Sequence, residues 1–100
     1  MKLQNKVAIV TGAGSGMGKA IALLFAKEGA KVVVSDINLE TLKQVVAEIT
    51  FDGGIATAVM ANVAKEPDVQ IMVDTAVNTY GTIDILVNNA GIMDNFAPRG

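Results

Sequence analysis

A glycine-rich stretch near the N-terminus constrains the fold more than any other feature of the chain. Residues 11–18 read TGAGSGMG and join the apolar run Val7–Val10 to a segment whose apolar residues recur at helical spacing. A turn of this kind, between a buried strand and the start of a helix, presents free backbone N–H groups and the positive end of the helix dipole. Such a turn can bind a diphosphate, so the stretch predicts a dinucleotide-binding α/β domain.

The composition of the chain excludes several classes of protein and of catalytic site. The 100 residues are 51% hydrophobic, enough for one folded domain, and the net charge of −2 without a basic run argues against a nucleic-acid surface. The chain has no cysteine and no histidine, which excludes Cys/His zinc sites and Ser-His-Asp or Cys-His catalytic groups. The apolar run Val7–Val10 is shorter than a secretory or membrane segment requires, so we expect no membrane association and a cytoplasmic protein.

The rest of the chain alternates short β-rich runs with longer amphipathic stretches, which is typical of a parallel sheet with crossover helices. We predict strands at 7–10, 31–36, 55–63 and 83–88, and helices at 16–28, 39–50 and 67–80. The buried face of the first helix is expected to carry Ala20, Ile21, Leu24 and Phe25. Right-handed crossovers then give a Rossmann-like α/β fold with strand order 3-2-1-4 and helices on both faces. Ligands bind such sheets at the crevice between the first and fourth strands.

The glycine spacing is neither GxGxxG nor the GxxxxGK[ST] of an ATP-binding loop. It is Gly12-x-x-x-Gly16-x-Gly18, preceded by Thr11. In our interpretation Gly12 makes the tight turn, Gly16 admits the phosphates, and Gly18 lets the helix approach the sheet. The alternative is a flexible loop without a ligand, which the flanking strand and helix disfavour.

Asp36 ends the second predicted strand, where an acidic side chain can accept hydrogen bonds from both hydroxyls of the adenine ribose. A 2′-phosphate at this position would be repelled by roughly 4 kcal/mol per pair of unit charges at about 4 Å. The neighbours best placed to supply a cation, Ser15 and Ile37, are neutral. The cofactor is therefore predicted to be NAD rather than NADP. The alternative is a solvated aspartate at a strand end.

Two asparagine-containing segments complete the candidate site. Asn62 and Val63 come at the end of the third predicted strand, where the amide could hydrogen-bond the adenine amino group and Val63 could pack on the ring. A simple turn asparagine is an equally good explanation. The segment 88–91, with the sequence NNAG, places small and amide side chains at the switch point, close to the nicotinamide ribose. By itself that segment could also be a polar turn.

Together these motifs resemble the short-chain dehydrogenase/reductase family in order and spacing, over about residues 5–93. Met17 stands where the family usually has isoleucine, and Asn62 where aspartate is commoner. The resemblance implies cofactor-binding residues in four groups. These are Gly12, Ser15, Gly16, Met17 and Gly18 at the pyrophosphate, Asp36 and Ile37 at the ribose, Asn62 and Val63 at the adenine, and Asn89, Ala90 and Gly91 on the nicotinamide side.

The resemblance also implies an oxidoreductase that transfers hydride between NAD and a secondary alcohol or ketone. The family's catalytic Ser, Tyr and Lys have no counterparts here: the single tyrosine, Tyr80, is followed four positions later by Asp84. We predict that Tyr80 is a packing residue at a helix end, and we assign no catalytic residue. The chain is expected to be the N-terminal NAD-binding portion of a longer, homo-oligomeric enzyme and to be inactive alone. A non-catalytic dinucleotide-binding module or remnant is the alternative, and a nucleotide-sugar epimerase is a lesser one.

Overall fold

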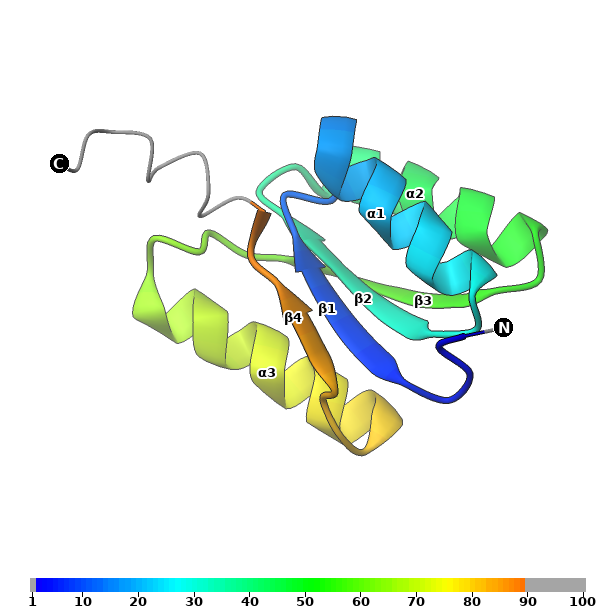
Figure 1. Cartoon of the computed structure of the whole chain (residues 1–100). Coiled ribbons are helices and arrows are strands. Elements are labelled where there is room, and N and C mark those ends of the chain that lie inside the picture. The colour runs from blue at the N-terminus through cyan, green and yellow to red at the C-terminus, as the bar shows by residue number, and fades with distance from the viewer. Residues whose placement is uncertain (1, 90–100) are drawn as a thin grey trace, which may run out of the picture.

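The computed structural model describes residues 2–89, which form a four-stranded parallel sheet with helices on both faces (Figure 1). The strands are β1 (Val7–Thr11), β2 (Lys31–Asp36), β3 (Ile55–Met60) and β4 (Ile85–Val87), and the helices are α1 (Gly16–Lys27), α2 (Leu39–Phe51) and α3 (Glu66–Tyr80). The strand order is β3-β2-β1-β4, and every pair is parallel. The predicted fold class and strand order are therefore confirmed.

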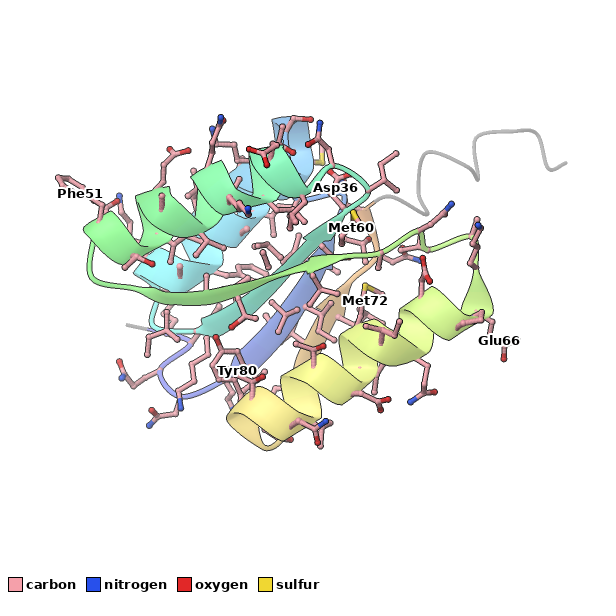
Figure 2. The ribbon with its side chains drawn as sticks, turned by 180° about the vertical axis from the view of Figure 1, so that it is seen from behind. Asp36, Phe51, Met60, Glu66, Met72 and Tyr80 are labelled. Carbon is pink, nitrogen blue, oxygen red and sulfur yellow. The ribbon has the colours of Figure 1, made fainter. Side chains whose placement is uncertain are left out.

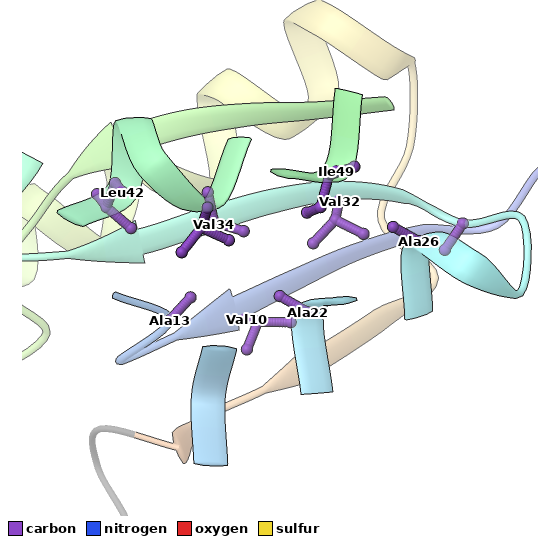
Figure 3. Close-up of a cluster of buried hydrophobic side chains, with 10 residues drawn as sticks. Val10, Ala13, Ala22, Ala26, Val32, Val34, Leu42 and Ile49 are labelled. Carbon is purple, nitrogen blue, oxygen red and sulfur yellow. The ribbon is translucent and has the colours of Figure 1, made fainter. Parts of the chain in front are cut away.

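Two helices cover one face of the sheet and the third covers the other (Figure 1). The central strand β2 contributes to both cores, because successive side chains of a strand point to opposite faces. Val32 and Val34 belong to the cluster beneath α1 and α2, which Figure 3 shows, and Val33 belongs to the cluster beneath α3. This burial on both sides explains why β2 has a continuous apolar sequence rather than an alternating one.

The buried face of α1 differs in part from the predicted one. Ile21 and Phe25 pack, partly buried, against the cluster beneath α1 and α2, as predicted. The fully buried residues are Gly18, Ala22 and Ala26, whereas Leu24 is 55% exposed and Ala20 is also exposed. The prediction was wrong for Ala20 and Leu24 because apolar residues surround most of this helix, so periodicity alone could not select a face. Small residues face the sheet instead, which lets the helix backbone lie close to the strands.

The third strand is shorter than predicted, because β3 ends at Met60 and not at residue 63. The N–H of Ala61 still donates to the carbonyl oxygen of Asp36 at 3.0 Å, but the chain then leaves the sheet. The side chain of Asn62 accepts a hydrogen bond from the N–H of Ala64 at 2.9 Å, which stabilises a turn in place of further pairing.

The fourth strand begins two residues later than predicted, at Ile85. Asp84 precedes it and ties it to β1: the Asp84 N–H donates to the Val7 carbonyl oxygen, and the Asp84 carboxylate accepts from the Val7 N–H, both at 2.8 Å. Within residues 2–89 no helix is long and apolar enough to cross a membrane.

Candidate functional site

The turn between β1 and α1 depends on two glycines with left-handed backbone conformations. Gly12 has φ +64° and Gly16 has φ +59°, values that residues other than glycine adopt only with strain. A Cβ atom at Gly16 would have nothing within 4 Å, so this position is open space. The geometry shows a tight turn at Gly12 and open space at Gly16, and the contact of Gly16 with phosphates stays a prediction.

Gly18 is required because the first turn of α1 lies directly against the preceding turn. A Cβ atom at Gly18 would overlap the carbonyl oxygen of Gly12, and it would lie 2.8 Å from Nδ2 of Asn89. The same Asn89 nitrogen donates to the Gly12 carbonyl oxygen at 3.4 Å. The close approach predicted for Gly18 is thus to the glycine turn and to the end of β4.

Gly14 is a structural residue of the site that the sequence analysis missed. Its N–H donates to Oδ2 of Asp36 at 2.9 Å, so it joins the turn to the end of β2. A Cβ atom at this position would lie 2.8 Å from the same carboxylate oxygen and would overlap the hydroxyl of Thr41. The sequence feature that could have indicated this role is that Gly14 is a further glycine in residues 11–18, a stretch expected to face the strand-end carboxylate of Asp36.

The amino end of α1 has backbone donors but no side chain that caps them. Ser15 is the N-cap residue, yet its side chain makes no capping hydrogen bond, and the first turn contains no acidic residue. Ser15, Gly16 and Met17 are exposed. The first N–H groups of a helix have no acceptor within the helix, and together with the helix dipole they favour an anion.

A pocket of about 240 Å³ adjoins this turn at the carboxyl ends of β1, β2 and β3. Its lining residues are Gly12, Ser35, Asp36, Ile37, Ala61, Asn62, Val63 and Ala64. The structure thus brings together five of the predicted site residues from three separate segments. Figure 2 labels Asp36 at this end of the sheet.

The Asp36 carboxylate is held by two backbone donors. Oδ2 accepts from the N–H of Gly14 at 2.9 Å, and Oδ1 accepts from the N–H of Ile37 at 2.7 Å. No lysine or arginine forms an ion pair with Asp36 among residues 2–89. An oriented carboxylate with lone pairs to spare can accept hydrogen bonds from hydroxyl groups entering the pocket.

Asn62 both forms a turn and lines the pocket. Oδ1 accepts from the N–H of Ala64, and the backbone N–H of Asn62 donates to the Asp68 carboxylate at 2.9 Å. Because Oδ1 is already engaged, the group that Asn62 offers most freely is the amide nitrogen, a donor. The contact with Asp68, in the first turn of α3, was not predicted.

The glycine turn and the end of β4 lie together at the switch point. The Thr11 hydroxyl is 3.3 Å from the Val87 carbonyl oxygen and 3.2 Å from Oδ1 of Asn88, and it is hydrogen-bonded to both. Asn89 contacts Gly12, as described above. The predicted site residues Ala90 and Gly91 lie outside the described residues.

Tyr80 lies far from this site. Its hydroxyl is 2.7 Å from the hydroxyl of Thr57, and its ring packs against the cluster beneath α3. Figure 2 shows Tyr80 at the opposite end of the sheet from Asp36. Its predicted role as a packing residue at a helix end is confirmed.

The fold and the site define a doubly wound parallel α/β domain with a glycine-rich turn and an uncapped helix start at its topological switch point. Residues 6–99 match the family model of the short chain dehydrogenases. The chain belongs to this family of oxidoreductases, whose members generally bind nicotinamide dinucleotides.

Individual relatives agree with this assignment. The chain is 53% identical over 92 residues to the cyclohexanol dehydrogenase of Acinetobacter sp. (strain SE19), which covers 92% of this chain and 37% of the relative. It is 48% identical over 91 residues to the 7alpha-hydroxysteroid dehydrogenase of Escherichia coli (strain K12), covering 91% and 36%. The crystal structure of a hydroxysteroid dehydrogenase from Escherichia coli superposes with a TM-score of 0.86 at 47% identity, covering 87% of this chain and 37% of that chain. The chain therefore spans little more than a third of the length of these relatives.

Proposed function

We propose that this chain is the cofactor-binding portion of an NAD-dependent dehydrogenase that acts on a secondary alcohol or ketone. The observation that carries the proposal is the uncapped amino end of α1, which lies beside a pocket containing an oriented carboxylate. The bound nicotinamide would supply the hydride acceptor or donor. The cyclic alcohol and hydroxysteroid in the names of the relatives support this substrate class.

The residues present fit a dinucleotide. The backbone N–H groups of residues 15–18 would hold the diphosphate, because they lie at the positive end of the α1 dipole and no side chain caps them. The pocket beside Gly12 would hold the adenosine half, with Asn62 and Val63 at the base. Asn89, with Ala90 and Gly91, would lie on the nicotinamide side.

Asp36 supports NAD in preference to NADP. Its carboxylate would accept from the ribose hydroxyls, and the backbone N–H groups of Gly14 and Ile37 prevent it from turning away from the pocket. A 2′-phosphate would be repelled by this negative charge. No lysine or arginine among the described residues forms an ion pair with Asp36 that would offset the repulsion. In this proposal the described residues hold the cofactor, and residues elsewhere in a cytoplasmic, homo-oligomeric enzyme perform the proton transfer.

The test is calorimetric titration of the purified protein with NADH and with NADPH. We expect NADH to bind at least about tenfold more tightly, as one unfavourable charge pair implies. Asp36→Asn keeps an acceptor for the Gly14 N–H while removing the charge, so it should reduce this ratio severalfold.

Asp52→Asn is the matched control, because Asp52 is an exposed aspartate that follows α2, outside the pocket. It should leave both affinities unchanged. Equal binding of the two cofactors by the unmodified protein would contradict the assignment to NAD, and binding of neither would contradict the proposed function.

A further inference from the structure

Ser35 carries a buried hydroxyl without a hydrogen-bond partner. The residue is 0% exposed, and its Oγ is the one buried side-chain polar atom that lacks a partner among residues 2–89. An unsatisfied buried hydroxyl costs about 1–3 kcal/mol, and such groups are rare in folded proteins. The hydroxyl of Ser35 therefore lacks a partner that residues 2–89 could supply, which makes it a candidate to bond a ligand.

The position of Ser35 indicates where that partner would be. Side chains alternate along β2, and Val33 belongs to the cluster beneath α3, so Ser35 lies on the same face two residues closer to the carboxyl end. It is paired in register with Thr11 on one side and Val59 on the other. Ser35 also lines the pocket that contains Asp36.

The other hydroxyls on this face of the sheet are bonded within the protein. Thr57, on β3, pairs with the Tyr80 hydroxyl at 2.7 Å. Thr11, on β1, is bonded to the end of β4. Ser35 lies between these two strands, and of the three hydroxyls it is the one that both lines the pocket and lacks a partner.

We propose that the Ser35 hydroxyl donates a hydrogen bond to the adenosine half of the bound dinucleotide. This inference rests on the proposed function and adds a residue to that site. The adenosine half presents acceptors without protons, the ring nitrogens and the ribose ring oxygen. Asp36 can only accept hydrogen bonds, so Ser35 supplies the complementary donor at the bottom of the same pocket.

Replacing this hydroxyl should have opposite effects on stability and on binding. Ser35→Ala removes an unsatisfied group from the ligand-free protein, so its melting temperature should stay the same or rise. The same change should weaken the binding of ADP-ribose about fivefold, the effect of one lost hydrogen bond. Binding of nicotinamide mononucleotide, which has no adenosine, should change less than about twofold.

Thr57→Val is the matched control, because it removes a hydroxyl from the same face that does have a partner. It should lower the melting temperature and leave the affinity for ADP-ribose unchanged. Ser35→Cys keeps the shape of the side chain, with a somewhat larger atom and a poorer donor, and it should weaken ADP-ribose binding as Ser35→Ala does.

Three results would overturn the inference: unchanged ADP-ribose affinity in Ser35→Ala, a melting temperature lowered as in Thr57→Val, or equal weakening of the mononucleotide. A failure of the unmodified protein to bind ADP-ribose at all would instead reject the proposed function, and the inference with it. Whether the unmodified protein binds ADP-ribose therefore distinguishes a failure of the Ser35 inference from a failure of the proposed function.

Discussion

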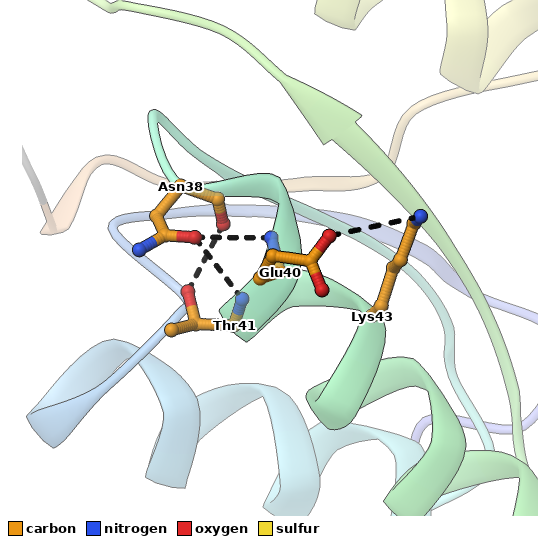
Figure 4. A network of polar contacts seen from close by, with 4 residues as sticks. All are labelled: Asn38, Glu40, Thr41 and Lys43. Carbon is orange, nitrogen blue, oxygen red and sulfur yellow. Dashed lines mark hydrogen bonds and ion pairs between the residues drawn. The ribbon is translucent and has the colours of Figure 1, made fainter.

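The amino ends of α1 and α2 occupy equivalent places in the fold but are built differently. Both follow a parallel strand and begin at the same edge of the sheet. At α2, Oδ1 of Asn38 accepts from the N–H groups of Glu40 and Thr41 at 3.0 and 3.3 Å, and the Thr41 hydroxyl donates back to the Asn38 carbonyl oxygen at 3.0 Å (Figure 4). At α1, the side chain of the N-cap residue Ser15 makes no capping hydrogen bond.

In the proposed function, this difference distinguishes a helix start that stabilises the fold from one that binds the cofactor. Asn38 and the acidic Glu40 satisfy the donors and the dipole of α2 from within the chain. A missing cap costs α1 about 1 kcal/mol, and the proposed function assigns its free backbone donors to the diphosphate of the cofactor. Four substitutions test this comparison.

The largest effect is expected from Gly18→Ala. The new methyl group would overlap the Gly12 carbonyl oxygen, a backbone atom that cannot move without opening the turn. We expect a loss of about 3 kcal/mol in the free energy of unfolding, measured by urea denaturation, and loss of ADP-ribose binding. Gly16→Ala is the control, because open space surrounds it and only the left-handed backbone is strained, at about 1–2 kcal/mol. Equal losses in the two variants would contradict the proposed packing of α1.

Met17→Glu would give α1 the acidic first turn that α2 has. Met17 is 70% exposed, so the carboxylate can be accommodated and should stabilise the helix by about 0.3–1 kcal/mol. It would also repel a diphosphate at the same helix end, and we expect about tenfold weaker NADH binding by calorimetry. Met17→Gln, which adds no charge, should bind NADH within about threefold of the unmodified protein. Unchanged binding in the glutamate variant would place the diphosphate elsewhere.

Asn38→Ala would remove the cap that distinguishes α2. The expected loss of stability is about 1 kcal/mol, because two backbone donors lose their acceptor. ADP-ribose affinity should be unaffected, since Asn38 does not line the pocket. Asn38→Ser, which retains a capping oxygen, should recover most of the stability in the same denaturation experiment. A loss of binding without a loss of stability would show that the two helix starts are not functionally distinct.

Glu40→Gln is expected to have the smallest effect. Its ion pair with Lys43 is 4.0 Å long and its side chain is 82% exposed, so solvent screens it strongly. The change in unfolding free energy should stay within about 0.5 kcal/mol and should diminish at high salt. A larger loss that persists in salt would mean that Glu40 stabilises the start of α2 by another route.

Much of the fold could be predicted because it depends on local patterns. The alternation of short apolar runs with amphipathic stretches placed every strand and helix within about three residues of its position, as the difference at β3 illustrates. The glycine turn was predictable for a similar reason, since the left-handed conformations of Gly12 and Gly16 suit glycine. The assignment of nucleotide contacts to the site residues remains a prediction.

Most of the missed features involve pairs of segments that are distant in sequence. The Gly14–Asp36 hydrogen bond requires β1 and β2 to lie in one particular register, and the Asp84–Val7 pair requires the same of β1 and β4. The hydrophobic periodicity of one segment does not indicate which of its residues pair with those of a neighbouring strand. Likewise, the choice of Gly18, Ala22 and Ala26 as the buried face of α1 depends on how closely the helix approaches the sheet.

The sequence by itself determined the order of the strands and helices and the location of the glycine turn, because backbone preferences and hydrophobic periodicity act over a few neighbouring residues. The tertiary structure alone decided that the Ser35 hydroxyl is buried without a partner among residues 2–89, and that Asp36 is held facing the pocket by the N–H of Gly14. These properties depend on which groups the packed strands and helices bring within hydrogen-bonding distance, and that is a relation between segments far apart in the chain.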